Sequence, residues 1–241
     1  MEKYLYWELY DLEESHWWHT SKKALVLNLA KKYLRKPKSH ILDIGCGTGK
    51  NVEALSQLGI CSGIDNSREA INFCRKRKLP RIKLASAEKT GFADQSFDLV
   101  TLLDVLEHTD DQKTLTEVHR ILKNKGLGLI TVPAYTWLWS KWDEVLHHRR
   151  RYNKQSLQNL LEQNGFTILK ISYFNSFLIL PVAIIRIIKS VFPKSTYGSD
   201  FRISFPLAGS VVSILSALET GILEKHNLPM GTSLVCVARK S

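Results

Sequence analysis

Short apolar runs and amphipathic segments alternate along the chain. Runs rich in β-favouring residues occupy 41–44, 60–64, 82–85, 97–103, 127–132, 166–173 and 232–238. Apolar residues recur at helical spacing over 24–34, 50–58, 68–78, 111–122 and 154–163. A helix-spaced segment follows most of the apolar runs, and this alternation predicts an α/β domain.

The first apolar run ends in three alternating glycines. The stretch from Ile41 to Gly49 reads ILDIGCGTG, which predicts a buried strand, a tight turn and the start of a helix. Glycine suits such a turn because a residue without a Cβ turns sharply and lets a ligand lie against the backbone. A dinucleotide-binding loop carries glycine at its first, third and sixth positions, whereas the sixth position here is Lys50. The turn is therefore expected to bind a nucleoside that lacks a pyrophosphate.

Two acidic residues stand at the ends of later strands. Asp65 ends the second apolar run, twenty residues after Gly45. An acid at this distance lies beside the glycine turn and can accept hydrogen bonds from both ribose hydroxyls. The alternative for Asp65 is a helix N-cap, a role that Asn66 or Ser67 can also fill. Asp104 ends the fourth run, at the carboxyl edge where open α/β sheets bind ligands.

These residues together carry a family resemblance. The string from Ile41 to Gly49, Asp65 and the segment from Ser96 to His108 resemble class I S-adenosylmethionine (SAM)-dependent methyltransferases, a likeness that covers roughly residues 40–135. It implies a Rossmann-like seven-stranded sheet, mostly parallel with an antiparallel last strand, and helices on both faces. It also implies SAM as the cofactor, released as S-adenosyl-L-homocysteine. The aromatic-then-arginine order after residue 134 further resembles bacterial type 11/12 methyltransferases of glycan and lipid-linked metabolite pathways.

The resemblance places the cofactor pocket at the glycine turn and at the ends of the second, third and fourth strands. The expected cofactor-binding residues are Asp43, Gly45, Cys46, Gly47, Thr48, Gly49, Asp65, Asn66, Ser86, Ala87, Glu88, Asp104 and Val105. One position departs from the family: Ser86 stands where relatives usually carry an acid that accepts the adenine amino group. A serine hydroxyl or the backbone would have to replace that contact.

Segments outside this core define the expected domain organisation. Residues 1–38 are expected to form an aromatic, partly helical cover, and 39–241 the methyltransferase domain, with an acceptor loop at 134–152 and an apolar helical insertion at 174–231 before the last strand. In methyltransferases of this kind such a leader commonly lies over the SAM pocket. The alternative is that its aromatic rings simply pack an N-terminal helix onto the domain.

The acceptor loop carries most of the candidate acceptor chemistry. The expected substrate-binding residues are Trp18, Tyr135, Trp139, Asp143, Arg150 and Arg151. Arginine forks bind carboxylate or phosphate bidentately, so an anionic acceptor is expected. The expected catalytic residues are His108, His148 and Tyr152, with Asp143 orienting His148.

Plainer interpretations of the same residues stay open. His108 can be a hydrogen-bonded turn histidine that shapes the pocket, and 147–152 can be an exposed basic turn before the helix at 154–163. No metal site is predicted, because His147 and His148 are adjacent and no further ligands repeat at suitable spacing.

Charge and the remaining apolar segments bear on partners. The net charge of +11 and the pI near 9.5 favour anionic partners, although a basic surface alone accounts for them equally well. The basic run at 75–78 is expected to be a solvated helix end, so nucleic acid is not the expected partner. The apolar stretches 177–192 and 205–218 are too short to span a bilayer, which takes about 20 residues. They predict peripheral membrane contact, a dimer interface or a roof over the acceptor site.

Four cysteines without paired spacing and an N-terminus without an apolar signal core predict a cytoplasmic protein, peripheral at the inner membrane face if the apolar segments dock there.

The expected function is methyl transfer from SAM to a small or lipid-linked anionic acceptor, at oxygen. Two alternatives stay open: an RNA or protein methyltransferase, and a SAM-binding module without catalysis. No residue pattern indicates an oligomeric state.

Overall fold

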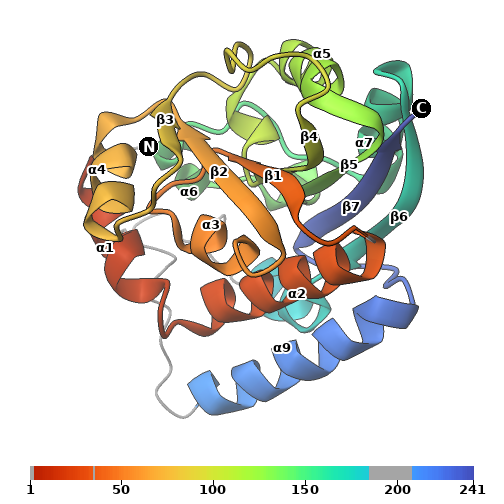
Figure 1. Ribbon diagram of the computed structural model, residues 1–241. Coiled ribbons are helices and arrows are strands. Elements are labelled where there is room, and N and C mark those ends of the chain that lie inside the picture. The colour runs from red at the N-terminus through yellow and green to blue at the C-terminus, as the bar shows by residue number, and fades with distance from the viewer. Residues whose placement is uncertain (1–2, 35, 185–207) are drawn as a thin grey trace.

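The computed structural model describes residues 3–34, 36–184 and 208–241, and the account below concerns these residues (Figure 1). They form one sheet of seven strands. The strands are β1 (Ser39–Ile44), β2 (Gly59–Asp65), β3 (Ile82–Leu84), β4 (Phe97–Leu103), β5 (Leu122–Pro133), β6 (Phe166–Phe174) and β7 (Ser233–Lys240).

The sheet has the order β3-β2-β1-β4-β5-β7-β6. Strand β7 runs antiparallel to both β5 and β6, whereas the other neighbouring strands pair in parallel. The predicted mostly parallel sheet with an antiparallel last strand is therefore confirmed. The carboxyl ends of β1, β2 and β4 meet at one edge, which is where the glycine turn lies.

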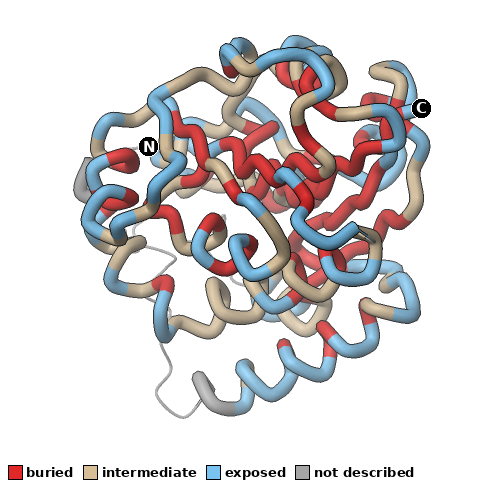
Figure 2. Tube along the Cα trace, in the orientation of Figure 1, coloured by how far each residue is buried: buried red, intermediate tan, exposed pale blue. Residues whose placement is uncertain are grey.

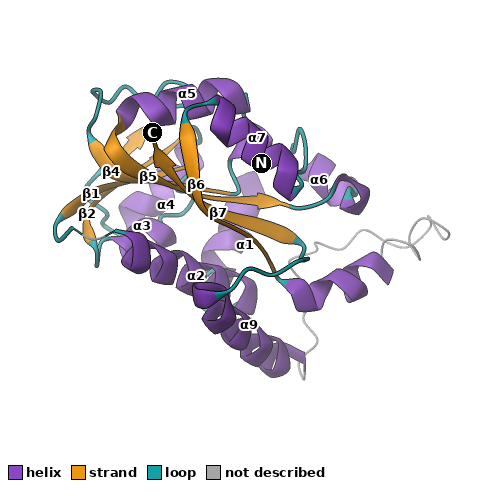
Figure 3. Cartoon of the chain, turned by 90° about the vertical axis from the view of Figure 1, so that its right-hand side faces the viewer, coloured by secondary structure: helices purple, strands orange, loops and turns teal. Residues whose placement is uncertain are grey.

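Helices cover both faces of the sheet. They are α1 (Lys3–Leu12), α2 (Trp17–Tyr33), α3 (Lys50–Leu55), α4 (Arg68–Lys76), α5 (Asp111–Ile121), α6 (Lys141–Val145), α7 (Lys154–Gln163) and α9 (Ala208–Lys225). Figure 3 shows α5 and α7 on one face of the sheet and α2, α3 and α9 on the other. Helices α2 and α9 lie side by side (Figures 1 and 3). Both faces of the central strands are thus covered, which explains their unbroken apolar runs.

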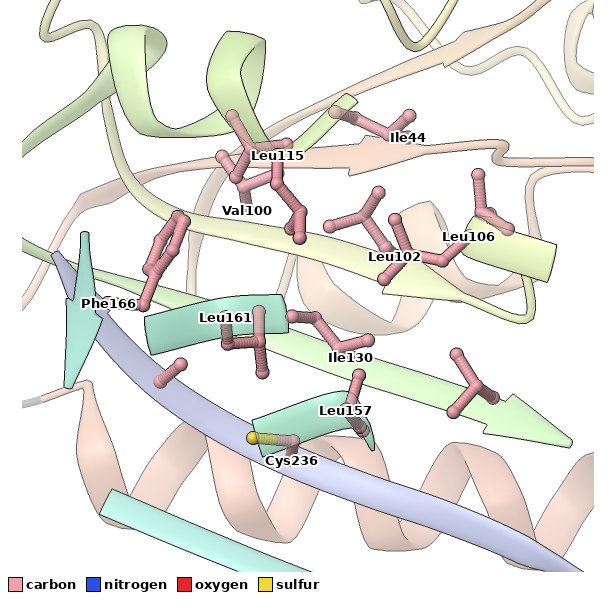
Figure 4. Close-up of a cluster of buried hydrophobic side chains, with 14 of the residues drawn as sticks. Ile44, Val100, Leu102, Leu106, Leu115, Ile130, Leu157, Leu161, Phe166 and Cys236 are labelled. Carbon is pink, nitrogen blue, oxygen red and sulfur yellow. The ribbon is translucent and has the colours of Figure 1, made fainter. Parts of the chain in front are cut away.

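The sheet divides the core into two clusters. On one face, Leu102 and Ile130 pack with Leu115 of α5 and Leu161 of α7 (Figure 4). On the other face, residues of α2 such as Leu29 pack against the sheet. Figure 2 shows the central strands mostly buried and α9 largely exposed. The site at the carboxyl edge therefore stands on a well-packed sheet.

Helix starts follow from local sequence. Ser67 caps α4 because its hydroxyl accepts a hydrogen bond from the backbone N–H of Ala70 (3.4 Å). Asp110 caps α5 in the same way, accepting from Lys113 N at 3.2 Å. Such side chains satisfy backbone donors that have no partner within the helix.

Several boundaries differ from the sequence prediction. Helix α3 stops at Leu55 and α4 at Lys76, each two or three residues before the expected end. Strand β5 begins at Leu122, five residues before the apolar run at 127–132 predicted from the sequence. Leu122 pairs with Phe97, and a register shift follows within β4. The tendency of Lys123, Asn124 and Gly126 to form a turn is thus overridden by pairing of the strands.

The leader and the insertion contain more helix than predicted. In the leader, α2 begins at Trp17 rather than at residue 24, and α1 is a separate helix. In the insertion, α9 continues to Lys225, beyond the expected end at 218. Residues 185–192 and 205–207 of the apolar stretches lie outside the described residues.

Helix α9 presents an apolar strip to the surface. Its exposed apolar side chains are Val211, Ile214, Leu215, Leu218 and Ile222. Their spacing of three or four residues places them on one helix face. Among the helices described here, none combines the length and the apolar character needed to cross a bilayer.

Replacing Asn153 by Ala is expected to lower the free energy of unfolding by roughly 0.5–2 kcal/mol. Asn153 begins α7 with a capping box: its side chain accepts from Ser156 N at 2.8 Å, and Ser156 Oγ accepts from Asn153 N at 3.0 Å. Both residues are exposed, so the substitution removes the cap without opening a cavity. Urea unfolding measures the loss. Gln155→Ala, an exposed position in the same helix, is the control, and an equal effect of the two substitutions would contradict the assignment.

Candidate active site at the carboxyl edge of the sheet

The three alternating glycines form the turn between β1 and α3. Gly45, Gly47 and Gly49 have φ angles of +69°, +54° and +90°. A Cβ at Gly45 would lie 2.5 Å from Val105 Cγ2, and one at Gly49 would lie 2.4 Å from Leu79 Cδ1. Both the backbone angles and the lack of space therefore require glycine at these two positions. The tight turn predicted from the sequence is present.

Asp65 lies beside this turn, at the end of β2. Its Oδ2 accepts a hydrogen bond from Gly47 N and its Oδ1 from Ser67 N, both at 2.9 Å. Burial raises the pKa of Asp65, against the opposing effect of these backbone hydrogen bonds. A carboxylate has about four acceptor positions, so Asp65 can still accept from ribose hydroxyls. Asn66, the next residue, is exposed.

Glu13, which directly follows α1 in the leader, binds residues at the glycine turn. The carboxylate of Glu13 accepts hydrogen bonds from the Thr48 hydroxyl and from the Arg77 guanidinium. Arg77 Nε also donates to the Thr48 carbonyl oxygen at 3.1 Å. The leader therefore contacts the turn directly. Its function as a cover over bound cofactor stays a prediction.

Asp43 and Cys46 flank the start of the turn, and both are buried. Asp43 Oδ1 accepts from Thr101 Oγ1 at 2.6 Å, whereas Asp43 Oδ2 has no hydrogen-bond partner among the described residues. Burial raises the pKa of Asp43 from 3.8 to about 7, although the hydrogen bond from Thr101 opposes it. Buried polar atoms without partners are rare, so Oδ2 is a candidate for ligand contact. The Sγ atom of Cys46 lies 3.9 Å from that of Cys74, and neither forms a disulfide.

Asp104 follows β4 with a left-handed φ angle of +57°. Its Oδ1 accepts from Thr131 Oγ1 at 2.8 Å, and its Oδ2 accepts from Lys22 Nζ at 2.6 Å. Burial favours a raised pKa for Asp104, but the Lys22 ammonium together with the hydrogen bonds from Lys22 and Thr131 lowers it. Residues in this backbone region, when they are not glycine, are concentrated at functional sites. Lys22 belongs to α2, so the leader contacts this edge too, but the sequence did not indicate a role for Lys22.

His108 and His148 meet at the same edge. Their ring centroids are 4.7 Å apart and the rings are inclined by 74°. His148 Nδ1 lies 2.8 Å from Asp143 Oδ1, and the His108 ring is hydrogen-bonded to the backbone of His147. Burial lowers the pKa of His108 to about 4, and the neighbouring His148 adds to this effect. The structure thus brings together the two candidate bases and the orienting acid. Their catalytic roles stay predictions.

Asp143 is fully buried and also binds Arg151. Arg151 Nε donates to Asp143 Oδ1 at 2.7 Å, and Arg151 Nη2 donates to Oδ2 at 3.0 Å. Burial favours a raised pKa for Asp143, but the hydrogen bonds from His148 and Arg151 hold the pKa well below its usual range. Asp143 and Arg151 were expected to contact the acceptor. In the structure they bind each other, and Asp143 also binds His148; their contact with the acceptor stays a prediction.

Glu107 is a candidate that sequence reasoning missed. It is fully buried next to His108, and neither carboxyl oxygen accepts a hydrogen bond from another described residue. Burial, with the nearby Asp104 carboxylate, raises the pKa of Glu107 well above its usual range. One ligand atom from each of Glu107, His108 and His148 lies within 4.8 Å of the others. The available sequence signal was an acid directly beside a histidine at the end of a buried strand.

Tyr152 and Arg150, a predicted base and a predicted acceptor ligand, both bind Asp111. The Tyr152 hydroxyl donates to Asp111 Oδ2 at 3.1 Å, and Arg150 Nη1 donates to the same oxygen at 2.8 Å. Burial and the Asp111 carboxylate raise the pKa of Tyr152, which disfavours its predicted role as a base. Arg150 remains half exposed and lines a cavity of about 270 Å³, so it can still bind an anion there.

The remaining predicted site residues contact neighbouring rings or, for Ser86, a nearby acid. Tyr135 stacks on Tyr173 with a centroid distance of 5.0 Å, Trp18 meets the edge of Trp17, and Trp139 is partly buried. The Ser86 hydroxyl donates to the carboxylate of Glu88. Glu88, two residues along, therefore brings a carboxylate next to Ser86. Ala87 lies between them.

Known proteins resemble the chain in sequence and fold. Residues 42–130 match the family described as "Methyltransferase domain". An uncharacterized protein of Methanocaldococcus jannaschii is 33% identical over 154 residues, 64% of this chain and 64% of that protein. The ubiquinone biosynthesis O-methyltransferase of Bartonella quintana is 26% identical over 149 residues, 54% of this chain and 60% of that protein. A SAM-dependent methyltransferase structure from Archaeoglobus fulgidus has a TM-score of 0.59 and 21% identity, covering 90% of this chain and 94% of that one.

Residues 42–130 are therefore similar to the methyltransferase-domain family, and the chain has the same fold as the SAM-dependent methyltransferase structure from Archaeoglobus fulgidus. It spans between half and two thirds of the length of the curated relatives that it matches, 64%, 52% and 51% for three of them. The family match covers the glycine turn, Asp65 and His108, and it ends before the acceptor loop.

Proposed function

We propose that this protein transfers a methyl group from SAM to an oxygen atom of a small or lipid-linked anionic acceptor. The proposal is carried by one observation: His108, His148 and Asp143 meet at the sheet edge that also holds the glycine turn. An amine or thiol acceptor needs little help from a base, whereas a hydroxyl must lose its proton as the methyl group arrives. The histidine pair supports an oxygen acceptor for this reason.

The cofactor residues have distinct roles in this proposal. Asp65 accepts hydrogen bonds from the ribose hydroxyls, and the glycine turn lets the nucleoside lie against the backbone. The unpaired Oδ2 of Asp43 would bind the cationic amino group of the methionine part. Ser86 and Glu88 bind the adenine amino group, since the hydroxyl and carboxylate lie together.

The reaction itself is an in-line displacement at the methyl carbon. The oxygen–carbon bond forms as the sulfur–carbon bond breaks, and the electron pair stays on sulfur, which gives neutral S-adenosyl-L-homocysteine. The acceptor proton passes to Nε2 of His148, because Asp143 occupies Nδ1 and stabilises the imidazolium that forms. Alignment of the reacting atoms can supply roughly 7–11 kcal/mol of the barrier.

Two features favour an anionic or lipid-linked acceptor. Arg150 keeps a half-exposed guanidinium beside a cavity, where it can bind carboxylate or phosphate. The apolar strip on α9 and the net charge of +11 together suit an acidic membrane surface on which a lipid-linked acceptor is presented. Peripheral membrane contact is therefore part of the proposal.

Replacing Asp65 by Ala is expected to weaken SAM binding by about 10- to 100-fold or more. The carboxylate is proposed to accept from ribose hydroxyls, and hydrogen bonds to charged groups contribute roughly 1.5–3 kcal/mol each. Isothermal titration calorimetry of the purified protein with SAM measures the change. The control is Asp94→Ala, an exposed acid paired with Arg120 on another part of the surface. Unchanged SAM affinity in Asp65→Ala would contradict the ribose contact, and absence of binding to wild type would contradict the proposed cofactor.

The acceptor class can be tested with labelled SAM. Cell extract is incubated with protein and methyl-labelled SAM and then separated into lipid, small-molecule, protein and RNA fractions. The proposal predicts label in the lipid or small-molecule fraction. Mild base should release the label if the product is a methyl ester, and the label should survive mild base if the product is a methyl ether. Label in RNA or protein would favour the alternative methyltransferase classes. No label in any fraction, with SAM bound, would favour a SAM-binding module without catalysis.

A further inference from the structure

Glu107, His108 and His148 have the donor atoms of a metal site. A carboxylate oxygen and two ring nitrogens lie within 4.8 Å of one another. Ligands that share a zinc-like ion at about 2.0–2.2 Å lie at most roughly 4.4 Å apart. A small side-chain adjustment would therefore bring all three onto one ion. Glu107 and His108 follow β4 and His148 follows α6, so the cluster joins two loops of the same sheet edge.

The buried carboxyl group of Glu107 is a second, independent observation. It is 0% exposed, and neither oxygen is hydrogen-bonded to another described residue. A buried acid without a partner is unfavourable unless a cation or a donor meets it. The nearby cations are already paired, since Lys22 binds Asp104 and Arg151 binds Asp143. A bound ion would give Glu107 the partner that it lacks.

Both imidazoles are held in the way that metal ligands are. A metal-binding histidine usually donates its other ring N–H to a carboxylate or a backbone carbonyl, which sets the tautomer and the ring orientation. His148 has Asp143 Oδ1 at 2.8 Å from Nδ1, and the ring of His108 is hydrogen-bonded to the backbone of His147. One nitrogen of each ring is left for an ion.

We propose that Glu107, His108 and His148 bind one divalent transition ion, such as Zn²⁺ or Mn²⁺, which holds the acceptor oxygen. Two imidazoles and one carboxylate favour such ions over Mg²⁺ and Ca²⁺, which prefer oxygen ligands throughout. Three protein ligands leave coordination positions open. A hydroxyl bound at an open position ionises more readily, as metal-bound water does, and releases its proton to solvent.

Binding of the ion and the role of the ion in catalysis rest on different observations. The role of the ion in holding an acceptor rests on the proposed methyl transfer, whereas ion binding rests only on the three side chains. With an ion bound, His148 acts as a ligand rather than as the base, and the ion activates the hydroxyl in its place. The methyl group then moves to the bound oxygen with the same electron balance as before.

Co²⁺ titration of the full chain tests ion binding directly. Protein is stripped with a chelator, dialysed and titrated with Co²⁺ while visible absorption is recorded. We expect saturation at one ion per chain and loss of the bands when Zn²⁺ is added. Glu107→Gln is expected to weaken binding by at least about 100-fold, because even loss of an outer partner of a ligand costs roughly 10- to 100-fold. His40→Ala, an exposed histidine at the opposite end of β1, is the matched control and should bind as wild type does.

Glu107→Gln keeps the side-chain shape and replaces the buried acid by a neutral amide, so it should fold, which urea unfolding checks. Absence of saturable Co²⁺ and Zn²⁺ binding by wild type at millimolar ion would overturn the proposal. Equal binding by wild type, Glu107→Gln and His148→Ala would overturn it as well, because the ion would then lie elsewhere. SAM titration of the same metal-free sample separates the two proposals: SAM binding without ion binding removes only the metal site, and ion binding without SAM binding removes only the methyltransferase.

Discussion

Replacing Asp143 by Asn is expected to lower the free energy of unfolding by about 3 kcal/mol, the lower end of the range for breaking a buried ion pair. Asp143 is fully buried and holds both the Arg151 guanidinium and His148. Asparagine has nearly the same shape but no charge, so the mostly buried Arg151 would lose its counter-ion. Chemical unfolding in urea measures the loss. Methyl transfer is expected to fall as well, since His148 loses the group that orients it.

An exposed ion pair provides the control for Asp143→Asn. Lys113 and Asp110 are paired at 3.0 Å, but the Lys113 side chain is 73% exposed. Lys113→Ala is therefore expected to change stability by less than about 1 kcal/mol. A loss for Asp143→Asn as small as that for Lys113→Ala would show that Arg151 finds water or another acceptor when Asp143 is neutral.

The effect of Asp143→Asn should also depend on pH. His148 and Arg151 hold the pKa of Asp143 below its usual range in the folded protein, although burial opposes them. The stabilisation is therefore present above the unfolded pKa of about 3.9 and is lost as pH falls through the folded pKa. Wild type and Asp143→Asn should accordingly differ most near neutral pH and converge in strong acid.

Local patterns were sufficient to predict an α/β domain and the position of most strands, whereas the seven-stranded sheet with its antiparallel last strand was implied by the family resemblance. A buried parallel strand is a continuous apolar run, and each run could be located without knowing its neighbours. The glycine turn after β1 was predictable because its requirement for positive φ angles restricts the residues to glycine. Asp65 followed from a fixed distance along the chain. The start of β5 was not predictable, because the pairing of Leu122 with Phe97 overrides the turn-forming residues after it.

The candidate site was predicted less completely, since it depends on contacts between distant segments. His108, His148 and Asp143 could each be named, but that they touch is a property of the folded chain. Lys22 lies in a leader whose polar residues carry no motif, and only the packing of α2 brings it to Asp104. Arg151 was predicted to bind the acceptor because arginine binds anions bidentately, and the sequence did not show that Asp143 supplies such a carboxylate within the fold.

Replacing Asp43 by Asn should change how stability varies with pH. Burial raises the pKa of Asp43 from 3.8 to about 7. Between these values the folded protein keeps a proton that the unfolded chain has lost, so the stability of wild type falls as pH rises through this window. The substituted asparagine side chain does not titrate and can still accept the hydrogen bond from Thr101. The stability of Asp43→Asn relative to wild type should therefore rise by roughly 4 kcal/mol between about pH 4 and about pH 8.

Urea unfolding at both pH values measures this change, and any constant cost of burying the amide cancels in the comparison. Asp94→Asn, at an exposed acid, should show little pH dependence relative to wild type. A constant difference between Asp43→Asn and wild type would mean that Asp43 is ionised in the folded protein at neutral pH. SAM links this measurement to function, because a cationic amino group beside Asp43 would favour the ionised carboxylate. Saturating SAM should thus reduce the loss of stability that wild type shows as pH rises. Asp43→Asn should be more stable than wild type at alkaline pH but should bind SAM more weakly.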